Sequence, residues 1–152
     1  MTKYEFVKRF LPEAEAAEKQ FRINPVIMLA QAAIESGWGE SDLAKQHRNL
    51  FGITGYGPSN EFWHGYQVIL SEGGLPFRKY ADTQSSFFDY ARLIATAYPV
   101  AAAASYYPAA FAREIAYSKY ISEVNGDNRA VYCRLLDNLS SAIGKLIKTP
   151  VC

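Results

Sequence analysis

A single carboxylate, Glu35, stands at the end of an otherwise apolar helical segment and is followed directly by Ser-Gly-Trp-Gly. Burial in such a segment and the negative end of the helix dipole both disfavour the ionised form of a carboxyl group. A carboxyl group whose pKa is raised in this way keeps its proton near neutral pH and can donate it to a reacting atom. Residues 31–39 therefore predict a buried general acid.

The helix that must position Glu35 is recognisable from its ends. Asn24 is a favourable N-cap, Pro25 suits the first helical position, and Gly37 is a natural stop. Between them the segment is apolar except for Gln31 and Glu35, which are four residues apart and share one face. This pattern favours a central helix whose polar stripe lines a cleft. The alternative is the solvated stripe of an ordinary amphipathic helix, which does not explain the wholly apolar remainder.

Helical patterns dominate the rest of the chain, with one interruption. Between residues 51 and 80 the composition shifts to glycine, aromatic and β-branched residues, and runs at 66–70 and 75–80 flank Ser-Glu-Gly-Gly, which predicts a hairpin with Pro76 on an edge strand. The fold class is thus α+β and mostly helical, with an α lobe and a small β-hairpin lobe (the insert, about 54–80) flanking a groove. We expect helices over residues 3–20, 24–36, 41–47, 85–98, 109–117 and 128–148.

Length and charge exclude several classes of protein. With 152 residues, the chain is long enough for one domain, expected over residues 1–152, to bury a core. A net charge of +1 without any Lys/Arg run argues against nucleic acid or an anionic membrane as a partner. No apolar stretch is long enough to span a bilayer, and the N-terminal segment lacks the apolar core of a signal peptide. We expect a monomer.

The cysteine and histidine residues show no metal-ligand spacing. Cys133 falls within a helical pattern and Cys152 at the terminus, so we expect a buried thiol and a loose terminal one rather than a disulfide. His47 and His64 stand apart from other potential ligands. We therefore expect no metal and no cofactor.

The insert carries two further acids, Glu61 and Glu72, beside several aromatic residues. In glycoside hydrolysis one carboxylic acid protonates the leaving oxygen while a second carboxylate, or the substrate itself, handles water or the developing cation. Glu72 lies at the predicted hairpin tip, from which a loop could reach over a cleft, although Glu-Gly-Gly is also plain turn chemistry.

Four motifs resemble, in the same order, those of bacterial endo-β-N-acetylglucosaminidases of glycoside hydrolase family 73. They are Ala-Ile-Glu-Ser-Gly-Trp-Gly at 33–39, Asn-Leu-Phe-Gly-Ile at 49–53, Phe-Arg-Lys-Tyr at 77–80 and Ser-Phe-Phe-Asp-Tyr at 86–90. The resemblance covers most of the chain. It implies a lysozyme-like fold and cleavage of peptidoglycan after N-acetylglucosamine.

The resemblance also assigns site residues. Glu35 matches the general acid of the family. The family's Thr-x-Glu element in the hairpin has its nearest equivalent at Ser71-Glu72, with Glu61 as the alternative second carboxylate. A C-terminal tyrosine-rich element corresponds to Tyr120 or Tyr132, of which we favour Tyr120 as the catalytic tyrosine that orients the 2-acetamido group.

We expect the residues that contact substrate to come mainly from these motifs and their neighbours. For Trp38 and Phe51, core packing is the stronger interpretation, and Asn49 is expected to tie its loop to the Glu35 helix, because a buried asparagine usually satisfies backbone groups. The expected substrate-binding residues are Gln31, Trp38, Asn49, Phe51, Tyr56, Tyr80 and Tyr132.

Three functions remain open on the sequence alone. The leading one is a peptidoglycan hydrolase of the N-acetylglucosaminidase type; a second is a muramidase or lytic transglycosylase; a third is a non-catalytic wall-binding module. Two carboxylates would suit a hydrolase, whereas substrate assistance by the acetamido group needs only the acid. Because peptidoglycan lies outside the cytoplasmic membrane, we expect action there, by an export route that the sequence does not reveal.

Overall fold

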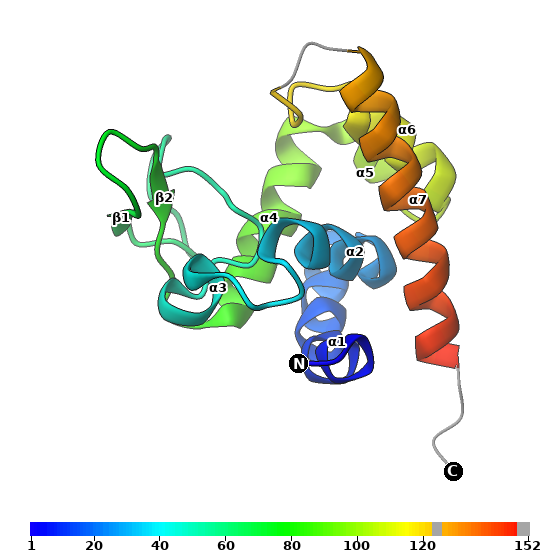
Figure 1. Ribbon diagram of the computed structural model, residues 1–152, viewed down its shortest axis with the longest axis horizontal. Coiled ribbons are helices and arrows are strands. Elements are labelled where there is room, and N and C mark those ends of the chain that lie inside the picture. Colours follow the sequence, from blue (N-terminus) through cyan, green and yellow to red (C-terminus); the bar gives the residue numbers. More distant parts are fainter. Residues whose placement is uncertain (123–125, 149–152) are drawn as a thin grey trace.

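The computed structural model describes residues 1–122 and 126–148 (Figure 1). The helices and strands of this part follow in chain order: α1 (Lys3–Phe21), α2 (Pro25–Ser36), α3 (Asp42–His47), β1 (Gln67–Ile69), β2 (Pro76–Arg78), α4 (Thr83–Ala97), α5 (Pro99–Ala103), α6 (Pro108–Ala116) and α7 (Gly126–Lys148). The predicted α+β, mostly helical, lysozyme-like class is confirmed.

Helix α2 occupies the centre of the helical lobe, with α1 and α7 packed against it (Figure 1). Its ends are those expected: the Asn24 side chain accepts a hydrogen bond from the Val26 backbone N–H at 3.0 Å, and Gly37 adopts the left-handed conformation with φ of 57°. Most of the helix between them is buried. Glu35 is therefore carried on the element that is held most firmly by the core.

An aromatic cluster connects α1, α4 and the loop after α3. Phe6 and Phe10 of α1 meet edge-on with ring centroids 5.0 Å apart, and Phe10 lies against Phe87 of α4. Phe51 stacks on Tyr90 with centroids 4.1 Å apart and planes 9° from parallel. These rings are almost fully buried, and aromatic pairs of this kind add to the stability that burial alone provides. They fix the loop at residues 49–53 relative to α1 and α4.

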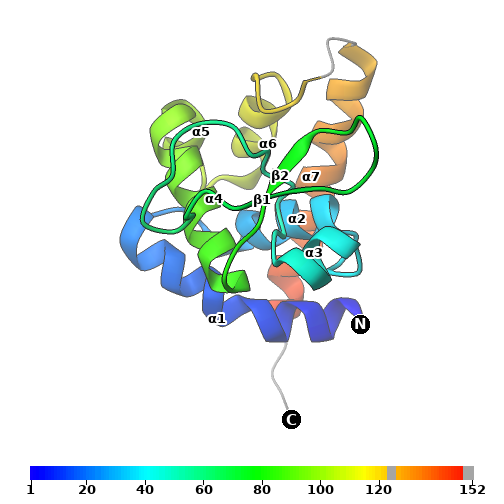
Figure 2. The same ribbon diagram turned by 90° about the vertical axis from the view of Figure 1, so that its left-hand side faces the viewer.

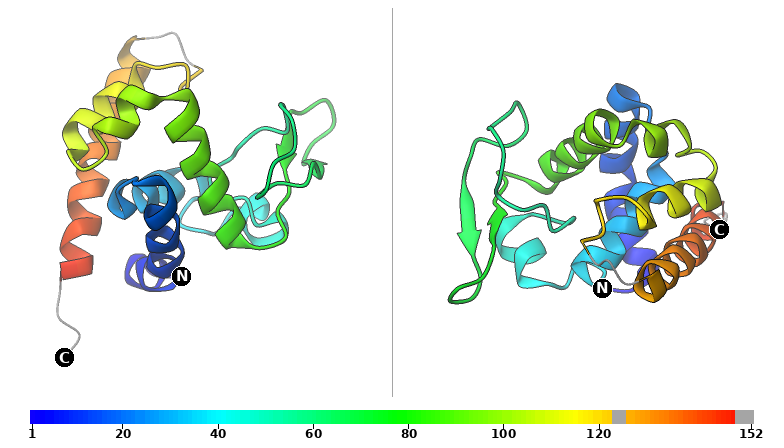
Figure 3. Two further views of the ribbon diagram at one scale, coloured as in Figure 1. Left: turned by 180° about the vertical axis from the view of Figure 1, so that it is seen from behind. Right: turned by 90° about the horizontal axis from the view of Figure 1, so that it is seen from above.

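The insert lies to one side of the helices, at the same end of the molecule as α3 (Figures 2 and 3). Its two strands form an antiparallel pair with Val68 opposite Phe77, and Thr54 forms a further bridge to Phe77. The strands are shorter than predicted, at three residues each. Most of the insert is thus held by side chains rather than by a sheet.

One helix was not expected from the sequence. Pro99 and the alanines after it form the short helix α5, because a proline at the first helical position is compatible with the helix and pre-sets its backbone. Elsewhere the predicted helices are confirmed to within two residues at each end. Within the described ranges, no helix is both long and apolar enough to cross a membrane.

Candidate active site

A groove of about 380 Å³ opens beside the C-terminal end of α2. It is bounded by α2, the loop after residue 50, helix α4 and the segment that follows α6. Among the described residues that line it, Glu35 is a carboxylate and Lys119 a cation. The lining residues are Glu35, Phe51, Gly52, Ile53, Thr54, Leu93, Tyr98, Lys119, Tyr120, Ile121 and Ser122.

Glu35 is held by a chain of hydrogen bonds that begins inside the core. The hydroxyl of Tyr132, on α7, donates to Oε1 of Glu35 at 3.2 Å. The side-chain amide of Gln31 donates from Nε2 to the Tyr132 hydroxyl at 3.1 Å, and its Oε1 accepts from the Tyr90 hydroxyl of α4. Residues of α2, α4 and α7 thus converge on one carboxylate.

Burial raises the pKa of the Glu35 carboxyl group, and the hydrogen bond from Tyr132 opposes this only in part. The sequence predicted a buried acid, but Glu35 is exposed to solvent at the groove, because it stands at the last turn of its buried helix. The protein atoms packed around its carboxyl group still remove part of the water that would solvate a negative charge. The same burial raises the pKa of Tyr120 and Tyr132, so both phenols stay protonated near neutral pH. The site combines a carboxylic acid with neutral hydroxyl donors.

The loop at residues 49–53 forms the wall that faces Glu35. The fully buried Asn49 amide donates to the carbonyls of Ile53 and Arg78, both at 3.0 Å, and its Oδ1 accepts from the backbone N–H groups of Phe51 and Ile53. Gly52 has φ of 65°, and a Cβ at this position would lie 3.8 Å from Oε2 of Glu35. The loop therefore brings bare backbone up to the acid.

The expectation for Asn49 was wrong in one respect. Asn49 joins its loop to strand β2 rather than to the Glu35 helix, because its amide lies beside the carbonyl of Arg78. A buried asparagine does satisfy backbone groups here, as expected, but the sequence did not indicate which ones.

A buried ionic cluster attaches the insert to α4, and sequence reasoning missed it. Asp89 is fully buried and accepts hydrogen bonds from Arg78 (2.8 Å), Tyr80 (2.5 Å), Arg92 (3.0 Å) and Asn60 (3.0 Å). Burial alone would raise the pKa of the Asp89 carboxyl, but the hydrogen bond from Tyr80 and the charge of Arg78 outweigh it and hold this pKa below its usual value. The signal was available, because a charge of each sign stands within the two aromatic motifs at 77–80 and 86–90.

Gln31 and Tyr80, like Asn49, were expected to bind substrate but are buried in this structure, with little surface left to face a ligand. Gln31 is fully buried, so the polar stripe that was predicted to line a cleft does so only at Glu35; Gln31 instead holds Tyr132. Tyr80 is 2% exposed and its hydroxyl is bound to Asp89. The Gln31 amide is hydrogen-bonded to Tyr90 and Tyr132, and the Tyr80 hydroxyl to Asp89, so these polar groups are already bound within the protein.

The remaining expected site residues divide between the core, the groove and the insert surface. Trp38 packs edge-on against Phe6, with centroids 5.4 Å apart, and Phe51 is almost fully buried, although it also lines the groove. Tyr120 lines the groove, but the hydroxyl that contacts Glu35 is that of Tyr132. Tyr56 is 58% exposed on the insert and does not line this groove.

The two candidates for a second carboxylate both lie on the insert surface. Glu72 is exposed in the turn between β1 and β2, and Glu61 is exposed in the long loop before β1. Neither is among the residues that line the groove around Glu35.

No arrangement of three or more His, Cys, Asp and Glu side chains suited to a metal ion is found within the described ranges. Cys133 is a free, partly buried thiol on α7. Cys152, named in the sequence analysis, lies outside the described residues.

The sequence did not indicate several residues that line the groove. They are residues 54, 98, 119, 121 and 122. These positions lie in loops or at helix ends and carry no motif of their own. They reach Glu35 through tertiary packing, because α2 packs on α1 and α7, while α4 packs on α1 and α6 on α7.

Comparison with known proteins gives relatives for most of the chain. The chain is 32% identical over 102 residues to the peptidoglycan hydrolase FlgJ of Vibrio parahaemolyticus, a match that covers 59% of this chain and 32% of FlgJ. It is 30% identical over 98 residues to the exo-glucosaminidase LytG of Bacillus subtilis, covering 58% of this chain and 33% of LytG. The matches thus span about a third of the length of these relatives.

The fold is that of a solved relative. The glycoside hydrolase domain of Salmonella typhimurium FlgJ superposes with a TM-score of 0.71 at 24% identity, over 97% of this chain and 92% of that domain. The model of the family described as mannosyl-glycoprotein endo-beta-N-acetylglucosaminidase matches residues 11–140, a range that holds Glu35, Gly52, Asp89 and Tyr132. The chain therefore belongs to this glucosaminidase family, glycoside hydrolase family 73.

Proposed function

We propose that this chain hydrolyses peptidoglycan at the glycosidic bond that follows N-acetylglucosamine, with Glu35 as the general acid. The observation that carries the proposal is the position of Glu35: its pKa is raised by burial, it lines the groove, and it lies on a helix fixed at both ends. The family and the names of the FlgJ and LytG relatives supply the substrate class.

The first step is transfer of the Glu35 proton. The O–H bond of the protonated carboxyl breaks while a new O–H bond forms on the glycosidic oxygen. The bond between that oxygen and the anomeric carbon breaks, and its electron pair goes to the oxygen. The carboxylate that remains on Glu35 keeps the hydrogen bond from Tyr132, which stabilises its new charge.

The second step takes its nucleophile from the substrate. The acetamido oxygen of the same sugar bonds to the anomeric carbon, and water then opens this ring, gives a proton back to Glu35 and leaves a reducing N-acetylglucosamine end. Among the residues that the structure describes, Glu35 is the one carboxylate in the groove lining, which supports this route. Tyr120 lines the groove with a protonated hydroxyl and is proposed to orient the acetamido group.

Glu72 is proposed to act from the hairpin turn on the bound glycan, not as an essential base. It is exposed and stands outside the groove lining, so a direct role in activating water would require the turn to move toward Glu35. The exposed Glu61 and Tyr56 of the insert are proposed to lie along the same surface.

The same lining also favours a second candidate function. A lytic transglycosylase acts at the neighbouring glycosidic bond and needs only one acid, which this groove supplies. The two activities leave different ends: N-acetylglucosamine at a reducing end in one case, anhydromuramic acid in the other. A muramidase would leave reducing muramic acid.

The test is digestion of purified peptidoglycan with the wild type, Glu35→Gln and the surface control Glu114→Gln. New ends are reduced with borohydride and identified by mass spectrometry. We expect reduced glucosamine ends from the wild type and the control, and a loss of about a thousandfold or more in Glu35→Gln. Muramic or anhydromuramic ends would support the second candidate, and no new ends from the wild type would favour a binding module.

The place of action follows from the substrate. Peptidoglycan lies outside the cytoplasmic membrane, and the wall-hydrolase relatives share that substrate by name. We propose that the chain acts there as a monomer.

A further inference from the structure

The side-chain amide of Gln31 is enclosed between two tyrosine hydroxyls on different helices. It is fully buried, with Tyr90 of α4 on one side and Tyr132 of α7 on the other. A buried amide with a hydroxyl on each side has two possible orientations, which exchange its oxygen and its nitrogen. Turning the amide over therefore reverses the direction of both hydrogen bonds. Which orientation is occupied decides what Tyr132 offers to Glu35.

The hydrogen bonds in the structure run in one direction. Tyr90 donates its proton to Oε1 of Gln31, so Nε2 faces Tyr132 and donates to its oxygen. The Tyr132 oxygen therefore has its own proton free for Oε1 of Glu35. In the opposite orientation the Gln31 carbonyl would accept the Tyr132 proton, and Tyr132 would present a lone pair to the carboxyl group.

The direction of these hydrogen bonds also gives the two carboxyl oxygens of Glu35 different roles. Oε1 accepts the Tyr132 proton, so the proton that is transferred to substrate belongs on Oε2. Oε2 faces Gly52, where no side chain stands between the oxygen and the groove. The geometry thus presents one oxygen to the protein and the other to the ligand.

We propose that Gln31 and Tyr90 are positioning residues that fix Tyr132 as a hydrogen-bond donor to Oε1 of Glu35 and leave Oε2 to carry the transferred proton. This inference rests on the proposed role of Glu35 as general acid. Neither Gln31 nor Tyr90 touches substrate, since both side chains are fully buried. Their effect reaches the reaction only through Tyr132.

Among the described residues, few other ionisable groups lie near Glu35. Tyr132 faces it from α7, Tyr120 and Lys119 share the groove from the segment after α6, and Tyr90 lies behind it on α4. The loop at residues 51–54 contributes no ionisable side chain. A change in the pKa of Glu35 on replacing a buried tyrosine hydroxyl therefore reports on the hydrogen-bond chain.

The direct test follows the Glu35 carboxyl group by NMR. Protein labelled with ¹³C at the glutamate carboxyl carbons is titrated as wild type, Tyr132→Phe, Tyr90→Phe and the double variant, with Glu35→Gln to assign the signal. Tyr106→Phe is the matched control, because its hydroxyl is bound to Glu18 on the outer surface. Tyr90→Phe keeps the ring that stacks on Phe51, so the core stays filled.

We expect the pKa of Glu35 to rise in Tyr132→Phe, because the ionised carboxylate loses a donor. In Tyr90→Phe the amide is free to turn and compete for the Tyr132 proton, so the pKa should rise in the same direction by less. The double variant should match Tyr132→Phe alone, and Tyr106→Phe should match the wild type. A fall in the pKa in Tyr90→Phe would show the opposite amide orientation, and no change would remove Tyr90 from the chain; either result overturns the proposal.

Activity supplies an independent reading. A general acid works while it is protonated, so a raised Glu35 pKa moves the falling limb of the pH–rate profile to higher pH. We expect kcat to fall about tenfold in Tyr132→Phe, the effect of one hydrogen bond to a charged group, and about threefold in Tyr90→Phe. If the wild type releases no reducing ends, the proposed function fails, while the NMR titration still decides the hydrogen-bond chain.

Discussion

The helical lobe and the insert hold their carboxylates in contrasting ways. Glu35 stands at the end of a helix that is packed on several sides, and its nearest polar partner is fixed by two further buried side chains. Glu72 stands in an exposed turn between two strands of three residues each. In the helical lobe, hydrogen bonds can determine which oxygen of Glu35 carries the proton. In the insert, Glu72 is exposed in a turn and can only contact a bound ligand.

The insert nevertheless has one firm attachment. Asp89 of α4 binds residues at positions 60, 78 and 80 of the insert, and the Arg78 guanidinium lies 4.0 Å from the centre of the Trp63 ring. A single buried carboxylate thus gives the insert an attachment to α4 that its short two-stranded sheet does not provide. The two acids that matter most, Glu35 and Asp89, differ in that one faces the groove and the other is closed off from water.

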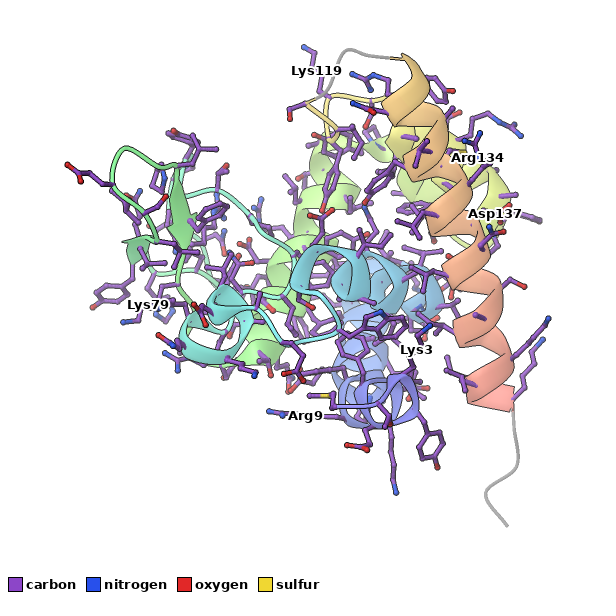
Figure 4. The ribbon with its side chains drawn as sticks, viewed as in Figure 1. Lys3, Arg9, Lys79, Lys119, Arg134 and Asp137 are labelled. Atoms are coloured by element: carbon purple, nitrogen blue, oxygen red, sulfur yellow. The ribbon has the colours of Figure 1, made fainter. Side chains whose placement is uncertain are left out.

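The largest effect is expected when the charge of Asp89, which attaches the insert to α4, is removed. Asp89→Asn leaves Arg78 as a buried cation without its counter-ion, and we expect a loss of about 3–5 kcal/mol in the free energy of unfolding. Urea unfolding measures the loss, and Asp137→Asn, on the outer face of α7 (Figure 4), is the surface control. Limited proteolysis should cut within residues 54–80 first; cutting first in α2 would contradict this account of the attachment.

Gly52 tests how much of the acid's reactivity depends on the bare loop beside it. Gly52→Ala places a side chain at φ of 65° and 3.8 Å from Oε2 of Glu35. We expect a stability loss of about 1–2 kcal/mol from the left-handed backbone, together with a severalfold fall in kcat. Gly73→Ala is the matched control, because its φ is 72° and a Cβ there meets no atom within 4 Å. Equal activity losses in the two variants would remove Gly52 from the site.

Replacing Glu72 tests whether the two acids, Glu35 and Glu72, differ in their contribution to kcat. If the substrate supplies the nucleophile, Glu72→Gln should lower kcat by less than about tenfold, against the much larger loss in Glu35→Gln. Glu61→Gln, the other exposed carboxylate of the insert, should behave alike. Release of reducing ends is the measurement, and a loss of about a hundredfold in Glu72→Gln alone would return this residue to the role of base.

The smallest effect is expected at the cation of the groove. Lys119 stands at the upper edge of the molecule in Figure 4 and lines the groove, where it can meet a carboxylate of a peptide stem. Lys119→Ala should raise KM about threefold for stem-bearing peptidoglycan, and less at high salt. Lys79→Ala, on the insert and outside the groove lining, is the control. An equal rise in KM on stem-free glycan would rule out recognition of the stem.

Most of the secondary structure could be read from local signals. Asn24, Pro25 and Gly37 place the ends of α2 because a cap satisfies groups within a few residues of itself. The hairpin was recognised from its turn, although the strands are shorter than their apolar runs suggested, since the insert has no second sheet to pack against. Helix α5 was missed because its proline was read as a break.

The sequence by itself determined that Glu35 ends a buried helix, and hence that its carboxyl group would resist ionisation. It could not determine the partners of that group. Tyr132 lies 97 residues beyond Glu35, and Tyr90 lies 59 residues beyond Gln31. Contacts at such separations depend on how α4 and α7 pack against α2, and neither helical periodicity nor capping carries that information. Tertiary structure therefore decided that Gln31 points into the core, and that the hydroxyl at the acid is Tyr132 rather than Tyr120.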